Sequence, residues 1–318
     1  MNSLYSVCEK AIYFKKTIKP QTLNNINHMV LSIIIVSWNV CDYLVDCIES
    51  ILKNCRLLQY EIIVIDNAST DGTVDLIKNK YPGLILIIND TNKGFAYANN
   101  QGIRQARGRY LLFLNPDTII KSNAVEKMLT FLEQNKDVGA IGPRLLNKDL
   151  TIQHSVRTFP TFRGALYRHT ILRYFGLFKE HHEKWRMKDF KSDRLTDVDQ
   201  LMGAAILAEK DLVLKVGGFD ERFFMYYEEV DFCYRIKKAG YRMVFFPNAS
   251  IIHLGGKSTR QISFRKKFMA IKSLLRFFGK HRNKPAVAGF AIFFLPLFII
   301  REILELPVRS VKARFKPV

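Results

Sequence analysis

The chain has 318 residues, of which 48% are hydrophobic and 25% are charged. This composition is typical of a globular protein, and it excludes intrinsic disorder and fibrous repeats. The 49 Lys and Arg residues outnumber the 29 Asp and Glu residues, and the net charge of +20 indicates an anionic partner such as nucleic acid, lipid head groups or a phosphorylated substrate.

Strand and helix patterns alternate from Met29 onward. Residues 1–28 have no clear periodicity and are expected to form a flexible lead-in or to reflect an upstream start codon. Strands are predicted at residues 30–37, 61–65, 84–88 and 110–114, and helices at 43–52, from 73 and at 96–106. This order predicts an α/β fold with a Rossmann-like, mainly parallel sheet and helices on both faces.

Polar residues follow each predicted strand, in Ser37-Trp38-Asn39, Asp66-Asn67, Asn92-Lys93-Gly94 and Asn115-Pro116-Asp117. Any one of these loops alone is compatible with simple capping of its neighbour. Four at the carboxyl edge of one sheet favour a ligand site, because open α/β sheets bind ligands there. The Gly-rich and Walker phosphate motifs are absent, so a bound nucleotide would need another counter-charge for its phosphates.

Asp117 can supply that counter-charge through a divalent metal. Pro116 fixes it at the end of a buried strand, and one carboxylate together with substrate phosphates is a common set of ligands for Mg²⁺ or Mn²⁺. The alternative is an N-cap for the helix predicted at 124–132. The residues between the two make direct capping the weaker interpretation.

A second acidic group follows an aromatic stretch. Glu228, Glu229 and Asp231 place three carboxylates within four positions, beside Tyr226 and Tyr227. Such a cluster is common at the polar start of a helix. Aromatic surroundings and like charges both raise a carboxyl pKa, however, and that suits a general base.

The chain resembles a family-2 glycosyltransferase of the GT-A fold, most like the bacterial rhamnosyltransferase branch. The matching strings, in the order and spacing of the family, are SIIIVSWN at 32–39, EIIVIDNASTDGT at 61–73, NKGFAYANNQGI at 92–103, ARGRYLLFLNPDT at 106–118, SVRTFPT at 155–161, MGAAILAEK at 202–210, GGFDERFFMYYEEVDFCYR at 217–235 and IIHLGGKS at 251–258. They cover roughly residues 31–258.

The resemblance implies a role for each matching position. The donor-binding residues would be Ser37, Asn39, Asp66, Asn67, Gly94, Asn100 and Asn115. Glu229 would be the catalytic base, with Asp231 as a supporting carboxylate that orients Arg235 or the acceptor. Asp117 and His253 would hold Mg²⁺ or Mn²⁺, and Lys257 would contact the diphosphate from a mobile loop. His253 read alone is equally compatible with a packed or solvent-exposed residue.

The implied reaction is a single inverting displacement, in which a nucleotide-sugar donor, with dTDP-rhamnose as the best guess, transfers its sugar to a lipid-linked glycan during cell-surface polysaccharide synthesis. Asn115 stands where the family often has the first Asp of D-x-D, so one ligand charge is missing. Another donor, such as a UDP-hexose or UDP-galactofuranose, and a non-catalytic, membrane-docked sugar-nucleotide or glycan binding protein are the alternatives.

The segment 150–200 is basic and aromatic. Its equivalent in the family shapes the acceptor pocket, which implies that Arg157, together with the later Tyr227, contacts the acceptor. A solvated helical insertion explains the same composition equally well. Residues 29–118 would form the nucleotide-binding half of the GT-A domain, and residues 119–256 its acceptor and catalytic half.

The charge excess lies chiefly in residues 257–318, which contain 15 Lys and Arg against 2 Asp and Glu. A separate basic tail favours an anionic membrane surface over nucleic acid, for which no motif is present. Apolar residues between 268 and 278 predict a basic amphipathic helix that docks either on the body or on lipid.

The uncharged run 286–300 comes next and contains Pro296. As a helix it would reach about 22 Å, short of a hydrocarbon core of about 30 Å, so shallow insertion is preferred over a full span.

The five cysteines show neither C-x-x-C pairs nor framework spacing, and the N-terminus lacks an uninterrupted apolar segment. We therefore expect no disulfides, no zinc site and no secretion. The sequence predicts an enzyme at the cytoplasmic face of the plasma membrane.

Overall fold

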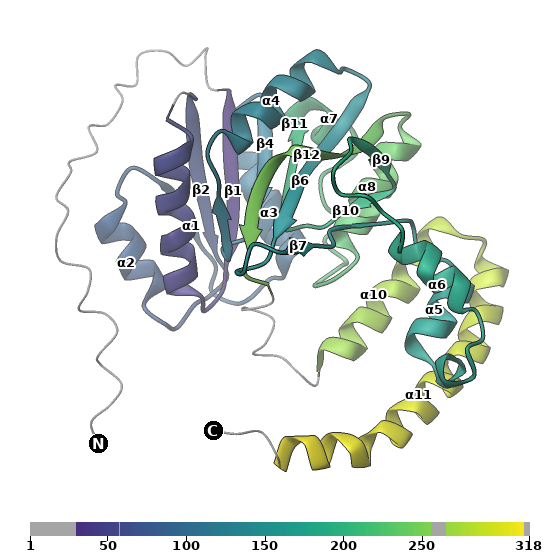
Figure 1. The fold of residues 1–318 in the computed structure, drawn as a ribbon. Helices are drawn as coiled ribbons and strands as arrows, with labels where there is room; N and C mark the ends of the chain where they lie inside the picture. The colour runs from purple at the N-terminus through teal and green to yellow at the C-terminus, as the bar shows by residue number, and fades with distance from the viewer. Residues whose placement is uncertain (1–29, 57, 256–264, 315–318) are drawn as a thin grey trace, which may run out of the picture.

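The computed structural model describes residues 30–56, 58–255 and 265–314. The predicted lead-in at 1–28 and the predicted diphosphate residue Lys257 lie outside these ranges. Figure 1 shows a central sheet between layers of helices, with the last two helices beside it.

The first part of the chain forms the parallel half of the sheet. Its elements are β1 (Leu31–Ser37), α1 (Cys41–Asn54), β2 (Tyr60–Asp66), α2 (Thr73–Lys80), β3 (Ile85–Ile88), α3 (Phe95–Gln105) and β4 (Tyr110–Leu114). The strands lie in the order β3-β2-β1-β4, all parallel, and Ser37 is in register with Asp66. Right-handed β-α-β crossovers are the usual way to join parallel strands, and they bring the carboxyl ends to one edge.

Beyond β4 the sheet is mixed. The elements here are β5 (Thr118–Ile120), α4 (Ala124–Gln134), β6 (Val138–Leu146), β7 (Ile152–Gln153), β8 (Val156–Arg157), α5 (Phe162–His169), the 3₁₀ helix η3 (Ile171–Phe175), α6 (Lys179–Arg186), β9 (Thr196–Val198), β10 (Gln200–Leu201), β11 (Ala205–Glu209), α7 (Lys210–Lys215), α8 (Glu228–Lys238) and β12 (Arg242–His253).

β11 joins β4 and β6 by antiparallel ladders, β12 runs parallel to β6, and β5 adds antiparallel to β12. The α/β fold with helices on both faces is confirmed, and its parallel character is confined to the first four strands and the β6–β12 pair among the described residues. β5 also separates Asp117 from α4, so Asp117 does not cap that helix.

Each face of the sheet has its own core. Alternate residues of a strand point to opposite faces, so Ile33 and Ile35 of β1 pack with α1 and α4, whereas Ile34 packs with α3 and Phe232 of α8. This alternation anchors α8 directly against the sheet.

The C-terminal segment forms α10 (Arg265–His281) and α11 (Lys284–Arg314). Ile271, Leu274, Phe277 and Phe278 of α10 are buried in a third core with Phe223, which precedes α8, and Val230 of α8. Of the two predicted alternatives, α10 therefore docks on the body. Figure 1 shows α5, α6 and α11 beside the sheet, with α11 curving along their outer side.

Candidate functional site

One pocket lies at the carboxyl edge of the parallel strands, and we call it the first pocket. All four predicted polar loops contribute to it, together with the segment before α8. It is lined by Val36, Ser37, Trp38, Asn67, Asn92, Gly94, Phe95, Asn115, Pro116, Asp117, Met202, Gly203, Ala204, Met225, Tyr226, Glu228 and Glu229. The structure thus brings most of the predicted donor, metal and base residues into one cavity.

Asp66 lies at the end of β2, next to Ser37 in the sheet. It is fully buried, and its Oδ2 accepts a hydrogen bond from the backbone N–H of Ser69 at 2.8 Å. Its Oδ1 and the Ser37 hydroxyl have no hydrogen-bond partner among the described residues. Buried polar atoms are normally satisfied, so this edge offers an acceptor and a hydroxyl to a ligand.

Asn39 braces the loop that follows β2 rather than lining the first pocket. Its Oδ1 accepts a hydrogen bond from the backbone N–H of Thr70 at 2.7 Å, and its own N–H donates to the Ser69 hydroxyl at 2.9 Å. Asn39 therefore positions the loop that follows Asp66, and its contact with a donor stays a prediction.

Asn67 and Gly94 hold two of the loops together. The Asn67 amide donates to the Gly94 carbonyl at 3.3 Å and accepts from Asn89 at 2.8 Å. Gly94 has φ +87°, and a Cβ there would lie 2.5 Å from the carbonyl oxygen of Phe224. Backbone geometry and space both require glycine here, which lets the loop approach the segment before α8.

Asn100 is a structural residue. Its Oδ1 accepts from the backbone N–H of Phe219 at 2.9 Å, and its amide donates to the Phe219 carbonyl at 2.8 Å and to Glu221 at 2.9 Å. It is not among the residues that line the first pocket. Asn100 therefore attaches α3 to the loop before α8, and the donor contact implied by the sequence stays a prediction.

Asp117 and His253 lie together at the edge of the first pocket. The His253 Nε2 is 3.4 Å from the Asp117 carboxylate, and both side chains are almost fully buried. The His253 Nδ1 lies 2.6 Å from Oε1 of Gln153, whose amide in turn donates to Asn147 and to the His253 carbonyl. Gln153 therefore faces His253 with its acceptor, so the Nδ1 of His253 donates to it and the Nε2 is the ring nitrogen that faces Asp117.

Asn115 also lines the first pocket. It occupies the position of the first Asp of the D-x-D motif, so this site has one carboxylate fewer. The described residues contain no group of three or more His, Cys, Asp or Glu side chains that could hold a metal ion. A divalent ion here would have Asp117 and His253 as protein ligands and would need oxygen atoms of a substrate or of water for the rest.

Glu228 and Glu229 begin α8 at the pocket wall. The two preceding residues, Tyr226 and Tyr227, both have φ +68°, a left-handed conformation that costs non-glycine residues about 1–3 kcal/mol each. This turn directs the first carboxylates of the helix into the cavity. Burial raises the pKa of Glu229, and burial together with the charge of Glu229 raises the pKa of Glu228.

A second pocket lies on the other side of Glu229. It is lined by Ser155, Arg157, Arg168, Trp185, Gln200, Leu201, Met202, Tyr226, Tyr227, Glu229 and Val230. Both predicted acceptor residues, Arg157 and Tyr227, are in this wall. Glu229 lines both pockets, together with Met202 and Tyr226, so the two cavities adjoin at this residue.

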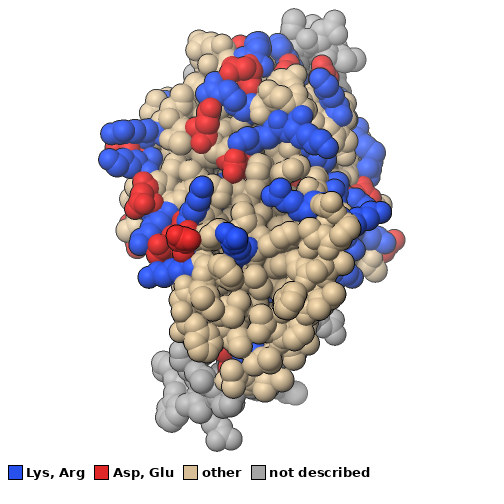
Figure 2. Space-filling view, turned by 90° about the vertical axis from the view of Figure 1, so that its right-hand side faces the viewer, with Lys and Arg blue, Asp and Glu red and all other residues tan. Residues whose placement is uncertain are grey.

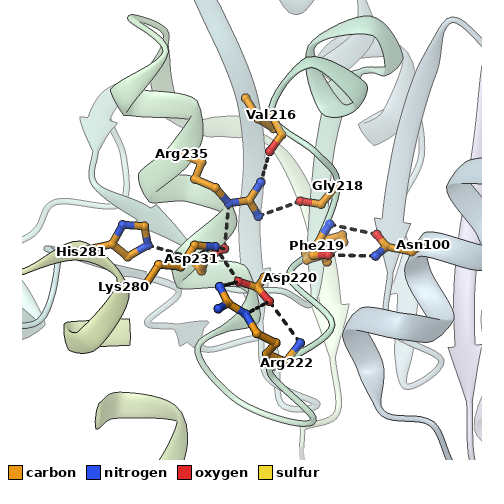
Figure 3. A network of polar contacts seen from close by, with 10 residues as sticks. All are labelled: Asn100, Val216, Gly218, Phe219, Asp220, Arg222, Asp231, Arg235, Lys280 and His281. Carbon is orange, nitrogen blue, oxygen red and sulfur yellow. Dashed lines mark hydrogen bonds and ion pairs between the residues drawn. The ribbon is translucent and has the colours of Figure 1, made fainter. Parts of the chain in front are cut away.

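Asp231 points away from both pockets, toward α10. Figure 3 shows its carboxylate between Arg235 of the same helix and Lys280 and His281 of α10. The closest distances are 2.8 Å to Arg235, 2.8 Å to Lys280 and 2.7 Å to His281. Burial alone raises the pKa of Asp231, but these partners outweigh it and the pKa is lowered. Asp231 orients Arg235, as the sequence implied, and joins α8 to α10.

Comparison with known proteins identifies the family. The model of Glycosyl transferase family 2 matches residues 32–190. The chain belongs to glycosyltransferase family 2. It is similar to the N-acetylglucosaminyl-diphospho-decaprenol L-rhamnosyltransferase of Mycobacterium tuberculosis (strain H37Rv), with 30% identity over 62% of this chain and 67% of that protein. It is also similar to rhamnosyltransferase WbbL of Escherichia coli (strain K12), with 30% identity over 79% and 93%.

Solved structures share the fold of this glycosyltransferase. The mannosyltransferase PcManGT from Pyrobaculum calidifontis, in complex with GDP-Man and Mn²⁺, superposes with a TM-score of 0.53 at 16% identity, over 89% of this chain and 78% of that one. GalNAc-T7 with UDP, GalNAc and Mn²⁺ gives a TM-score of 0.54 at 16% identity, over 71% of this chain and 44% of that one. The GT-A architecture implied by the sequence is confirmed.

Sequence reasoning on this glycosyltransferase missed several residues of the site. Gln153 reaches His253 across 100 positions, and Lys280 and His281 reach Asp231 across about half that separation. No local pattern reveals such pairs. Arg168 and Trp185 carried a weak signal, because both belong to the basic and aromatic segment that the sequence singled out.

Proposed function

We propose that this glycosyltransferase is an inverting, metal-assisted rhamnosyltransferase. It would transfer rhamnose from dTDP-rhamnose to a hydroxyl of a lipid-linked glycan at the cytoplasmic face of the membrane. The observation that carries the proposal is the position of Glu229, whose carboxylate borders two pockets of different chemistry. The names of the relatives support the donor sugar and the kind of acceptor.

The first pocket suits the nucleotide-sugar. Asp66 and Ser37 offer buried hydrogen-bonding atoms to a nucleoside at the ends of β2 and β1. Trp38 provides an aromatic wall, and Asp117 and Glu229 line the same cavity. The donor would therefore bind with its base over the parallel strands and its sugar toward α8.

Asp117 and His253 fit a divalent metal ion. Gln153 accepts the Nδ1 proton, so the Nε2 of His253 presents a lone pair beside a carboxylate, and a hydrogen bond to the far ring nitrogen is the usual support of a metal-binding histidine. When bound, Mg²⁺ or Mn²⁺ would neutralise charge on the departing diphosphate. Two structural neighbours hold Mn²⁺ with a nucleotide, which supports this assignment.

Glu229 would act as the general base. Its carboxylate removes the proton of the acceptor hydroxyl while the hydroxyl oxygen forms a bond to the anomeric carbon of the donor. The bond from that carbon to the diphosphate oxygen breaks in the same step, and its electron pair leaves with the nucleoside diphosphate. Attack from the second pocket, opposite the diphosphate, inverts the anomeric configuration.

The outer face of α11 suits a membrane. Over Lys284–Glu305 this helix is long and apolar enough to cross a bilayer by length and composition, because it continues through Pro296 well beyond the uncharged run. The sequence predicted an apolar helix too short to span the bilayer, and the length of α11 corrects that prediction. Exposed apolar side chains on it are Ile292, Phe293, Leu295, Ile299, Ile300, Ile303 and Leu304.

The packing of α11 favours an orientation along the membrane surface. Phe290, Phe294 and Phe298 are buried in the third core, and Arg301 is buried with a hydrogen bond to the Arg168 carbonyl at 2.7 Å. Figure 2 shows this side of the molecule, with a broad area nearly free of charge below a region that is rich in Lys and Arg and also holds Asp and Glu. An apolar face bordered by basic residues is suited to shallow insertion into an anionic leaflet.

The test is release of nucleoside diphosphate by the purified protein from a panel of nucleotide sugars with Mg²⁺ or Mn²⁺. Synthetic N-acetylglucosaminyl-diphospho-prenol serves as the acceptor. We expect release from dTDP-rhamnose to rise when the acceptor is added, with formation of a rhamnosylated lipid. Absence of release from every nucleotide sugar would contradict the proposal, and preference for a UDP-hexose would revise the donor.

A further inference from the structure

Two arginines stack on Trp185 without a carboxylate partner among the described residues. The guanidinium of Arg168 lies 4.4 Å from the centre of the Trp185 ring, and that of Arg157 lies 5.3 Å from it. Arg186 is the next residue in the chain. Arg157 donates only to the carbonyls of its own segment, at Val156 and His154. A guanidinium stacked on an aromatic ring keeps its N–H edge free for an oxyanion.

The local electrostatics are strongly positive. Burial first, and then Arg186 and Arg168, lower the pKa of Arg157 to about 10. Burial and the same arginines lower the pKa of His182, which stacks on Trp185, to about 4. Glu229 is the one carboxylate in the wall of the second pocket as the structure describes it. Like charges held together in this way favour binding of an anion.

The position of this cluster separates it from the donor. It borders the second pocket, whereas the predicted nucleotide and metal residues border the first, and Glu229 stands between them. An anion bound at Trp185 would therefore belong to the molecule that supplies the attacking hydroxyl.

A third pocket continues from the second toward α11. Arg168, Tyr226 and Tyr227 line both cavities, and the third pocket then reaches Phe298 and Arg301 of α11. The opposite face of α11 carries the exposed apolar side chains. The pockets thus follow one another from Glu229, past the arginines, to the inner face of α11, where Lys267 and Glu302 also line the third pocket.

We propose that Arg157 and Arg168 bind the phosphate groups of a prenyl-diphosphate-linked acceptor. Both stack on Trp185 in the wall of the second pocket. The acceptor sugar lies beside Glu229, its diphosphate contacts the two guanidinium groups, and its prenyl chain leaves through the third pocket toward α11. The inference rests on the proposed function, because it specifies the acceptor of the same reaction.

The chain contains two tryptophans, and each lines a different pocket. Trp38→Phe leaves Trp185 as a fluorescent reporter of the second pocket, and Trp185→Phe leaves Trp38 as a reporter of the first. Both full-length variants are titrated with farnesyl diphosphate, farnesol and inorganic pyrophosphate in the presence of EDTA. We expect farnesyl diphosphate to change the fluorescence of Trp185, with much weaker responses to farnesol and to pyrophosphate.

Arg168→Ala in the Trp38→Phe background should raise the dissociation constant for farnesyl diphosphate at least tenfold. The matched control is Arg173→Ala, which removes a nearby arginine that stacks on Tyr174 outside the second and third pockets. The side chain of Arg168 is exposed, so its removal leaves the fold intact, and circular dichroism checks this. Unchanged affinity in Arg168→Ala would overturn the phosphate site.

Other outcomes are equally decisive. If farnesol binds as tightly as farnesyl diphosphate, the phosphate groups contribute nothing to binding. If pyrophosphate binds as tightly, the prenyl chain contributes nothing. If only Trp38 responds, the ligand lies in the first pocket, and each of these three results overturns the inference. Binding of dTDP-rhamnose, followed through Trp38 with Mn²⁺, tests the proposed function separately. If that binding and all sugar transfer fail while Trp185 still reports farnesyl diphosphate, the donor chemistry is wrong and the phosphate site stands.

Discussion

Lys280 of α10 lies 2.8 Å from the carboxylate of Asp231 in α8, inside the protein. The same lysine also binds Asp220 at 2.6 Å, in the loop before α8 (Figure 3). The helix that carries the candidate base is therefore fixed from the C-terminal side by a segment that the sequence presents as a separate tail.

Removing this link should lower the free energy of unfolding. Asp231→Asn leaves Arg235, Lys280 and His281 without their shared carboxylate, and breaking a buried ion pair costs about 3–5 kcal/mol. Urea unfolding at pH 7 measures the loss. Arg222→Ala is the control, because it removes an exposed partner of Asp220 and should cost far less.

The ion pairs of Asp231 also predict how the free energy of unfolding depends on pH. The folded-state pKa of Asp231 is below its unfolded value, so its contribution is complete above the unfolded pKa and is lost as the pH falls through the folded one. Wild type should lose more stability than Asp231→Asn between pH 7 and acid conditions. Parallel unfolding midpoints for the two proteins over that range would rule out this contribution.

Glu229→Gln should abolish sugar transfer, by a factor of about 10²–10⁴, while donor affinity stays near that of wild type. Because burial raises the pKa of Glu229, kcat/KM of wild type should increase with pH through a value above the usual range of glutamate and then level off. Stopped assays at several pH values with excess Mn²⁺ measure both effects. Full turnover by Glu229→Gln would shift the base to Glu228, which lines the first pocket only.

Gln153→Leu should weaken metal binding by about 10–100-fold, because it removes the acceptor that holds the Nδ1 proton of His253. Asp117→Asn should have a larger effect and should also reduce donor affinity. Titration of activity with Mn²⁺ gives both constants. Thr130→Val is a control, since its exposed hydroxyl donates to the Glu126 carbonyl within α4 and contacts neither Gln153 nor the metal pair. Identical titration curves for wild type and Gln153→Leu would argue against the supporting role.

Gly94→Ala should weaken the binding of the nucleotide-sugar donor. The left-handed φ strains any side chain, and the added Cβ would meet the Phe224 carbonyl at 2.5 Å, which forces the segment before α8 to move. Isothermal titration with a nucleotide sugar measures the affinity. Gly83→Ala has open space around its Cβ, so this matched variant should bind as wild type does.

Substitutions on the two faces of α11 should affect membrane binding and stability separately. Phe293→Ser and Ile300→Ser on the exposed face should reduce sedimentation with vesicles of phosphatidylglycerol and leave Tm nearly unchanged. Phe294→Ala on the buried face should lower the free energy of unfolding by about 3–5 kcal/mol. Full sedimentation of the Phe293/Ile300 double variant would show that this face is not the membrane contact.

The sequence alone determined the α/β order, the polar edge of the sheet and the family, because these depend on local features. The apolar runs of β1, β2 and β4 predict buried strands, and each ends in polar residues that the parallel sheet brings together. Asp117 and Glu229 stand in recognisable strings, and the structure places both at the first pocket. The antiparallel addition of β11 was not predictable, because its pairing with β4 is a long-range choice.

Tertiary structure alone decided which of the implied residues face a cavity and which support it. Asn100 and Asp231 occupy family strings just as Glu229 does, yet packing directs Asn100 to Phe219 and Asp231 to α10. Partners such as Gln153 and Lys280 lie far away in sequence, where no periodicity connects them to the site. The basic tail, which the sequence could assign either to the body or to lipid, divides between both: α10 is buried against the body, and α11 buries one face while it exposes the other.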